Sequence, residues 1–142
     1  MYRKYHNRTI VTSEGKFDSQ FEFDYYQRLK MLQRAGEISN LQRQVEFVLI
    51  PRQEEEVEVQ LKTKTKIVVQ FREHPCTYIA DFVYEKDGKR VIIDTKGFKT
   101  PDYIIKRKLM RWQGNPITEV SEKSIRAEER KKIKALMKKS PK

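Results

Sequence analysis

The 142-residue chain has a single cysteine, no long apolar run, and far fewer acidic than basic residues. The lone Cys76 excludes an internal disulfide and a cysteine zinc site, and it fits a reducing cytosol. The longest apolar runs, such as Phe47–Ile50, are much shorter than the roughly 20 residues of a membrane-spanning helix. The amino-terminal MYRKYHNRTI lacks the apolar core of a secretory signal. We therefore expect a cytoplasmic protein without membrane contact.

The shortage of acidic residues leaves a large positive charge. Thirty-one Lys and Arg stand against 20 Asp and Glu, which gives a formal net charge of +11. This balance excludes an acidic solvating protein, and the composition excludes a collagen-like or low-complexity chain. The basic excess gathers in residues 99–111 and 121–142. It favours a polyanionic partner, nucleic acid first and a membrane surface second, although a soluble domain with many surface lysines is the plainer alternative.

The length suits one domain with one core. We predict an amino-terminal arm or first edge strand over 1–16, a core over 17–120 and a basic carboxy-terminal helix over 121–142. A loose terminus is the alternative for the arm.

Apolar spacing and turn signals predict an α/β (α+β) fold, with helices packed on a sheet. Residues 19–35 predict a helix that Asp18 or Ser19 can cap. The glutamates Glu54–Glu56 read as a solvated loop or an edge. The other expected elements are strands at 44–50, 57–61, 67–71, 78–84, 90–96 and 117–120, and helices at 102–112 and 122–139.

The most informative signal is the Asp87-Gly88 dipeptide between two strands, which is typical of a two-residue hairpin turn. This turn pairs Lys86 with Lys89, and the same register carries Asp81 to a position directly opposite Asp94. Because side chains alternate along a strand, Asp94 and Lys96 share that face about 7 Å apart.

Two opposed carboxylates among apolar neighbours destabilise a sheet. A divalent cation would resolve this conflict, since Mg²⁺ prefers oxygen ligands and often takes one or two carboxylates together with water and phosphate oxygens. Lys96 would then orient a water or stabilise charge that develops on the phosphate. The plainer alternative is a solvated strand end, where Asp81 and Asp94 form an ordinary ion pair with Lys96.

The segments that carry a family resemblance are Lys16-Phe17-Asp18-Ser19 leading to Glu22, Thr77-Tyr78-Ile79-Ala80-Asp81-Phe82, and Asp94-Thr95-Lys96-Gly97-Phe98-Lys99-Thr100. Together they resemble the PD-(D/E)XK nuclease superfamily, and more closely a family of small phage and prophage proteins within it. The resembling segments span most of residues 1–112. The chain departs from the motif name at Ala80, where proline is nominal.

The resemblance implies a PD-(D/E)XK nuclease-like core, with a central mixed sheet flanked by helices. It implies that Asp81 and Asp94 bind Mg²⁺, for which Mn²⁺ would substitute, together with the main-chain carbonyl of Thr95. It also implies that Lys96 is the catalytic lysine and that Glu22 is the acidic residue that the first helix directs at the metal.

Glu22 has a structural alternative, because Ser19-x-x-Glu22 also fits a capping box. Gln44 could face the site, as a glutamine often does in related nucleases, or be an ordinary edge amide. For Lys99, Lys106, Arg107 and Arg111 we expect contact with the DNA backbone, with plain solvated surface as the alternative. His6 and His74 lack metal-ligand spacing.

These expectations combine into a Mg²⁺-dependent DNA endonuclease that hydrolyses phosphodiester bonds. Family analogy extends this to branched DNA or Holliday junctions in phage recombination or replication, to a homodimer, and to the bacterial host cytoplasm. The first rival is a non-catalytic DNA-binding accessory module that keeps the nuclease fold. The second rival is an RNA-binding or ribosome-associated basic protein.

Overall fold

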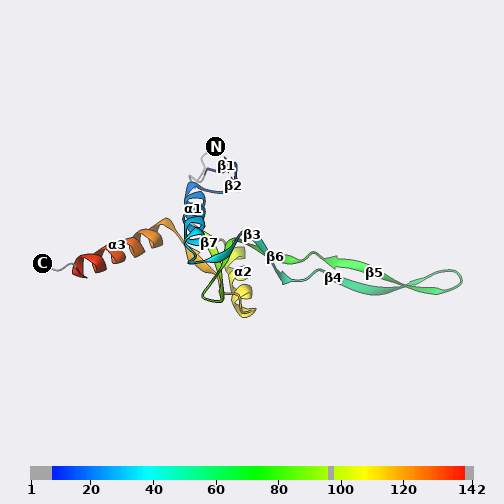
Figure 1. Ribbon diagram of the computed structural model, residues 1–142. Coiled ribbons are helices and arrows are strands. Elements are labelled where there is room, and N and C mark those ends of the chain that lie inside the picture. The colour runs from blue at the N-terminus through cyan, green and yellow to red at the C-terminus, as the bar shows by residue number, and fades with distance from the viewer. Residues whose placement is uncertain (1–7, 96–97, 140–142) are drawn as a thin grey trace.

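A computed structural model describes residues 8–95 and 98–139 of the chain. The expected α+β class is confirmed: the structure combines a mixed four-stranded sheet, two separate two-stranded sheets and three helices over these residues (Figure 1). The elements in chain order are β1 (Ile10–Thr12), β2 (Gly15–Phe17), α1 (Gln20–Arg34), β3 (Ser39–Ile50), β4 (Gln53–Gln60), β5 (Thr65–Glu73), β6 (Cys76–Lys86), β7 (Lys89–Thr95), α2 (Pro101–Trp112), β8 (Thr118–Val120) and α3 (Glu122–Lys139).

The four-stranded sheet has the order β3-β6-β7-β8. Its first three strands run antiparallel, while β8 lies parallel to β7 after the crossover through α2. The predicted hairpin turn is confirmed, since Lys86 pairs with Lys89 and Tyr84 with Val91. Asp87 and Gly88 both have positive φ, which a two-residue turn of this kind requires.

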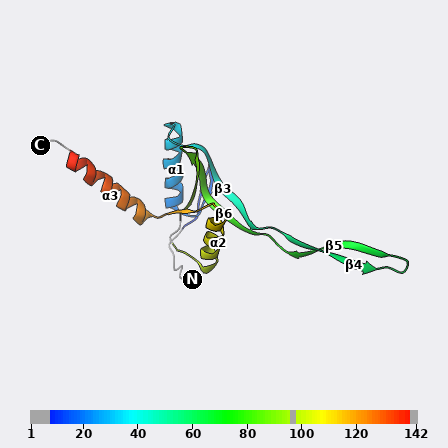
Figure 2. The same ribbon diagram turned by 90° about the horizontal axis from the view of Figure 1, so that it is seen from below.

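Helices α1 and α2 cover opposite faces of this sheet (Figure 2). Neighbouring residues of one strand show this directly, because Ile92 packs in the α2 layer and Ile93 in the α1 layer. The buried members of the α2 layer are Leu49, Tyr78, Ala80, Val83, Ile92, Tyr103 and Met110. The buried members of the α1 layer are Leu29, Ile38, Phe82, Ile93 and Val120. The sheet is therefore the middle of three layers.

Helix α1 begins as its sequence predicts. Ser19 is the N-cap, and its side chain accepts a hydrogen bond from the Glu22 N–H at 3.1 Å. Glu22 Oε2 accepts a hydrogen bond from the Asp18 N–H at 2.9 Å, one residue before the position that a standard capping box uses. Gly36, with φ +78°, follows the last turn.

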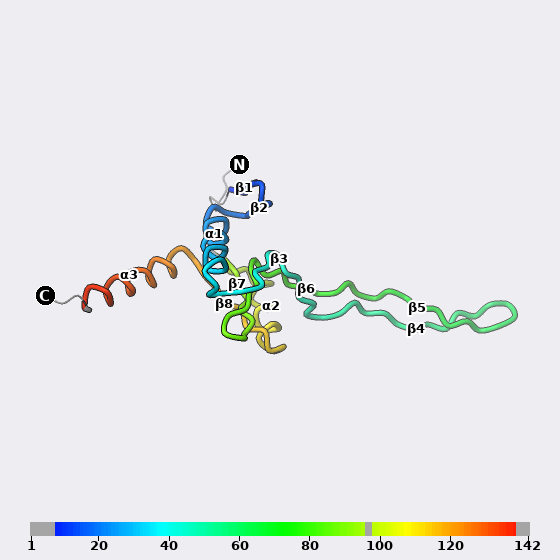
Figure 3. The backbone as a smooth tube through the Cα atoms, in the orientation of Figure 1, coloured from blue at the N-terminus to red at the C-terminus, as the bar shows by residue number. Residues whose placement is uncertain are grey.

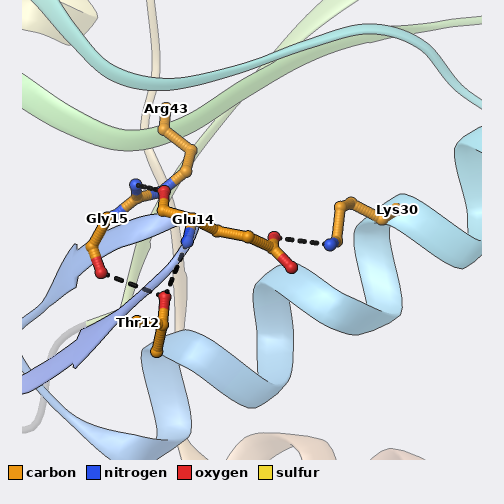
Figure 4. Close-up of polar contacts among 5 residues, drawn as sticks. All are labelled: Thr12, Glu14, Gly15, Lys30 and Arg43. Atoms are coloured by element: carbon orange, nitrogen blue, oxygen red, sulfur yellow. Dashed lines mark hydrogen bonds and ion pairs between the residues drawn. The ribbon is translucent and has the colours of Figure 1, made fainter.

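The β1–β2 hairpin is fastened to the body by Arg43 of β3 and Lys30 of α1 (Figure 4). The Arg43 guanidinium donates to the main-chain carbonyls of Glu14 and Lys16, at 3.3 and 2.8 Å, and lies 3.7 Å from the centre of the Phe17 ring. Lys30 pairs with the Glu14 carboxylate. Gly15 has φ +123°, a backbone conformation that residues with a Cβ rarely adopt, so this turn favours glycine.

At the level of Gln44 on β3 and Asp81 on β6, the side chains of both strands change the face of the sheet to which they point. On β3, Arg43 lies against the α1 side and Val45 packs in the α2 layer, although a regular strand would point both the same way. On β6, Ala80 packs in the α2 layer and Phe82 in the α1 layer. Gln44 has φ +50°, the left-handed conformation that such a twist needs. Asp81 therefore sits where the regular alternation of side chains breaks.

Strands β4 and β5 form a long two-stranded ribbon that projects from the body (Figure 3). From here on this ribbon is called the arm, as distinct from the amino-terminal segment 1–16. It continues β3 and β6, but Pro51 and Pro75 interrupt both strands at nearly the same level. Proline has no N–H for a ladder, so the arm begins as a separate sheet. The arm confirms the predicted hairpin around 62–66. It also shows that Glu54–Glu56 lie in an edge strand, so the loop interpretation was wrong and the edge interpretation was right.

Helix α3 extends from the body on the side away from the arm (Figure 2). Its range, Glu122–Lys139, agrees with the predicted helix. An ion pair of Glu129, near the middle of α3, with Arg28 of α1 at 3.8 Å links this helix to the body. In the described parts of the chain, no helix has the length and apolarity to cross a membrane.

The packing of α1 gives the first testable prediction. Leu29 is 1% exposed, so Leu29→Ala should lower the free energy of unfolding by about 2–5 kcal/mol, through lost apolar contact and the cavity left behind. Met31 lies on the same helix but is 67% exposed. Met31→Ala should change the free energy of unfolding by about 0.5 kcal/mol or less. Urea unfolding measures both, and equal losses would contradict the placement of α1.

Candidate functional site

The acidic residues predicted for the site come from three elements: Glu22 from α1, Asp81 from β6 and Asp94 from β7. Glu22 is 1% exposed and Asp94 is 2% exposed, while Asp81 is partly buried. Buried carboxylates are uncommon unless hydrogen bonds or charges compensate them. The partners of each side chain therefore define what this region can do.

Glu22 accepts a hydrogen bond through each of its carboxylate oxygens. One oxygen accepts from the Asp18 N–H at the helix start, as the capping interpretation expects. The other accepts from the Gln44 side-chain amide at 3.3 Å, so Gln44 reaches the region from the point where β3 twists. Burial first, and then the negative charge of Asp81, raises the pKa of the Glu22 carboxyl from its ordinary 4.5 to about 7. That charge coupling places Glu22 and Asp81 in one electrostatic environment.

Asp81 is held by Thr95, at the end of β7. Its Oδ2 accepts from the Thr95 N–H at 2.8 Å and from the Thr95 hydroxyl at 2.7 Å. In a continuing ladder the Thr95 N–H would donate to the main-chain carbonyl of Ala80. The β6–β7 pairing instead ends at Phe82 with Ile93, one step before the predicted pair of Asp81 and Asp94. The two strands thus part at the acidic residues, and a side chain takes over the free N–H.

Asp94 faces the α2 layer, where the Tyr78 hydroxyl donates a hydrogen bond to its Oδ2. Burial, and after it the charge of Asp94, raises the pKa of Tyr78, with a smaller contribution from Asp81. Tyr78 therefore stays a neutral hydrogen-bond donor, and the charges of both aspartates act on its pKa. Burial and Asp94 also raise the pKa of Tyr103 on α2. Asp94 is the carboxylate that the tyrosines of the α2 layer surround.

Glu119 is a further acidic residue of this region that the sequence reasoning missed. It lies in β8, beside Asp94 in the parallel ladder, and accepts from the Tyr103 hydroxyl at 3.0 Å. Arg107 and Lys99 pair with the same carboxylate, at 3.1 and 3.5 Å. Burial opposes ionisation of Glu119, but these partners together lower its pKa. In the sequence Glu119 is only a glutamate in a short predicted strand. Its place beside Asp94 can be recognised once the parallel pairing of β8 with β7 is known.

The residues predicted to contact DNA take different positions. Lys99 and Arg107 are committed to Glu119, although both keep part of their surface exposed. Lys106 is half-buried on α2 and Arg111 is exposed near the end of that helix. The side-chain amide of Gln44 contacts Glu22 of α1. Of the predicted contact residues on α2, Arg111 is therefore the exposed one, while Lys106 and Arg107 are partly buried.

Lys96, the predicted catalytic lysine, lies outside the described residues, as does Gly97. Its relation to Asp81 and Asp94 stays a prediction. His6, which lacks metal-ligand spacing to His74 in the sequence, also lies outside the described residues.

The donor set fits a hard divalent cation by chemistry. Asp81, Asp94 and Glu22 offer carboxylate oxygens, the ligands that Mg²⁺ and Mn²⁺ prefer. Burial, and after it the charge of Asp81, raises the pKa of Glu22, so a nearby cation would favour the ionised carboxylate. Within residues 8–95 and 98–139, however, no three His, Cys, Asp or Glu side chains lie close enough together to hold a metal ion. A bound cation would therefore rest on two carboxylates, with other oxygen ligands completing its coordination.

The chain belongs to the family described as "Protein of unknown function (DUF1064)", whose model matches residues 2–132. No curated protein and no solved structure matches the chain. The match includes all the described elements except the end of α3. The family description assigns no activity, so nuclease function and phage origin stay predictions from the sequence motifs.

The raised pKa of Glu22 predicts a pH-dependent stability in metal-free buffer with EDTA. Between pH of about 4.5 and 7 the folded chain holds a proton on Glu22 that the unfolded chain has lost. Stability should therefore fall as the pH rises through this window, at a scale of about 1.4 kcal/mol per unit of pKa difference. Glu22→Gln should remove most of this fall, because glutamine does not ionise.

The control for this prediction is Glu46→Gln, since Glu46 is exposed on β3. It should keep the pH dependence of the unaltered chain. Thermal unfolding of the three proteins at a series of pH values makes the comparison. Parallel pH profiles for Glu22→Gln and the unaltered chain would show that Glu22 ionises as it does in water.

Proposed function

We propose that this member of the DUF1064 family is a metal-dependent DNA endonuclease that hydrolyses phosphodiester bonds. The observation that carries the proposal is the position of Asp81 and Asp94 beside the point where β6 and β7 part, with Glu22 of α1 near enough to Asp81 to interact with its charge. Carboxylates in such an arrangement raise the free energy of the folded chain unless a cation compensates them. A site that lowers stability in this way is typical of function rather than of folding.

Asp81 and Asp94 are the residues that would hold Mg²⁺, or Mn²⁺ in its place, and the main-chain carbonyl of Thr95 is the third proposed ligand. When bound, such an ion polarises a phosphoryl oxygen and lowers the pKa of a coordinated water. Thr95 fixes the carboxylate of Asp81 through two hydrogen bonds, and Tyr78 fixes that of Asp94 through one. These contacts orient the two carboxylates.

The remaining residues position groups around this pair. Glu22 holds a proton near neutral pH, and together with the Gln44 amide it could orient a water on the α1 side. In this proposal Lys96, two residues after Asp94, stabilises the charge that develops on the phosphate. On the α2 side, Arg107 and Lys99 set a positive rim around Glu119, where a phosphate backbone would pass.

The proposed substrate is duplex DNA with branches or junctions, in phage recombination or replication, and the proposed assembly is a homodimer in the bacterial cytoplasm. The net charge of +11 supports a nucleic-acid partner, because counterion release favours binding of basic chains to phosphate backbones. The choice of branched DNA rests on the motif resemblance.

The second candidate function is a DNA-binding accessory module without catalysis. It is favoured by the hydrogen bonds that Asp81 and Asp94 already accept from protein groups. Such bonds stabilise the carboxylates without an ion. DNA binding with no cutting in any divalent metal would select this candidate.

Metal binding should raise the thermal stability of the chain. An ion that binds only the folded state at 100 times its Kd adds about 2.7 kcal/mol, which corresponds to roughly 5–10 °C in Tm for a chain of this size. Excess Mn²⁺ or Mg²⁺ should therefore raise Tm relative to EDTA. Asp81→Asn and Asp94→Asn should each abolish this rise while leaving a cooperative transition. Equal Tm in EDTA and in excess Mn²⁺ would contradict a metal site.

Nicking of supercoiled plasmid in Mg²⁺ tests the activity itself. Asp94→Ala should reduce the rate by roughly 100-fold or more, the usual scale for loss of a group that acts in the reaction. Asp24→Ala is the matched control, because Asp24 is exposed on α1, away from the proposed ligands. Asp24→Ala should nick like the unaltered chain. The same slow background cutting by all three proteins would rule out the endonuclease.

A further inference from the structure

The arm exposes apolar side chains that nothing in the described chain covers. Ile67 and Val69 are 62% and 61% exposed, although both lie in the middle of β5. The arm is a two-stranded sheet of its own, and an isolated two-stranded hairpin is at best marginally stable in water. A two-stranded ribbon that projects from the body therefore needs a partner to stabilise it.

The two edges of the arm differ in chemistry. The Leu61 N–H donates to the Lys64 carbonyl at 2.8 Å, which fixes the alternation of hydrogen-bonded pairs along the ladder. Counting from that pair, the N–H and C=O groups of Ile67, Val69 and Phe71 point away from β4, toward the free edge of β5. This edge contains no proline and no acidic residue from Thr65 to Arg72. Such an edge is a template for pairing with another strand.

The free edge of β4 carries the opposite chemistry. By the same alternation, its outward-pointing backbone groups belong to Glu54, Glu56 and Glu58. Two β4 edges placed together would put glutamates opposite glutamates, which destabilises a sheet. Charge therefore protects the β4 edge and leaves the β5 edge as the one that can pair.

We propose that the arm is a homodimerisation element, in which β5 pairs antiparallel with β5 of a second copy about a two-fold axis at Val69. In this register Ile67 lies opposite Phe71 of the second copy, and Val69 lies opposite its own equivalent. The outward-pointing backbone groups of these residues pair with each other, and the three apolar side chains of each copy join on one face of a four-stranded sheet.

The charge along the arm is complementary to its own two-fold copy. The tip carries Lys62, Lys64 and Lys66, whereas the end next to the body carries Glu54–Glu56 and Glu73. In the proposed register the tip lysines Lys62 and Lys64 of one copy come beside the acidic end of the other. Lys66 lies opposite Arg72, whose charge is paired with Glu55 of its own arm at 2.7 Å. Parallel arms would instead place the lysine tips side by side. An isologous contact of this kind closes on itself and gives a dimer. This contact involves the arm alone and does not require the proposed endonuclease activity.

Disulfide crosslinking of the full chain tests the register. In a Cys76→Ala background, Val69→Cys places two thiols across the proposed axis, within the range that a disulfide spans. Glu56→Cys is the matched control, because Glu56 pairs with Val69 across the arm and lies on the other edge. With a mild copper–phenanthroline oxidant, the Val69→Cys protein should give a covalent dimer on a non-reducing gel, and the Glu56→Cys protein should stay monomeric. Equal crosslinking of the two would overturn the proposal.

Sedimentation velocity of the chain without added cysteines is the second measurement. The unaltered chain should sediment as a dimer, and Val69→Lys should lose the dimer peak. The control Val11→Lys should keep it, because Val11 is 80% exposed on β1, away from the arm. A monomer at every concentration would overturn the proposal, as would a chain that dimerises only after duplex DNA is added. The last result would make the basic tip a DNA contact instead.

Discussion

The constraint on which this structure depends is the burial of carboxylates where two strands part. An antiparallel ladder can satisfy every N–H and C=O only while both strands continue, and β6 and β7 stop pairing at Phe82 and Ile93. Asp81 then supplies a side-chain acceptor for the Thr95 N–H, and the Tyr78 hydroxyl supplies a donor for Asp94. The same hydrogen bonds that close the end of the hairpin thus hold two acidic groups in place. Burial, and after it the charge of Asp81, raises the pKa of Glu22.

The local elements could be predicted from sequence because their signals are local. The Asp87-Gly88 turn determined the hairpin register, Ser19 marked the start of α1, and helical spacing of apolar residues marked all three helices. Each of these signals acts within a few residues, so neighbouring chemistry alone decides it. The arm was also predictable as a hairpin, although its length and its separation from the main sheet were not.

The details of the site depended on contacts between distant parts of the chain. Strict alternation predicted that Asp81 and Asp94 share one face, but β3 and β6 twist at Gln44 and Asp81, so alternation fails at the acidic residue itself. The placement of Glu119 beside Asp94 depends on the parallel pairing of β8, and its tyrosine partner, Tyr103, depends on the packing of α2. Pairing at such sequence distance leaves no periodic signal in either segment.

Divalent metal between the two aspartates is the central claim, and a crystal structure grown with Mn²⁺ tests it most directly. Anomalous scattering at the manganese edge should show one strong peak within coordination distance of oxygens from both Asp81 and Asp94. A peak bound elsewhere, or no peak at saturating Mn²⁺, would contradict the account. The buried acids would then serve only to close the end of the hairpin.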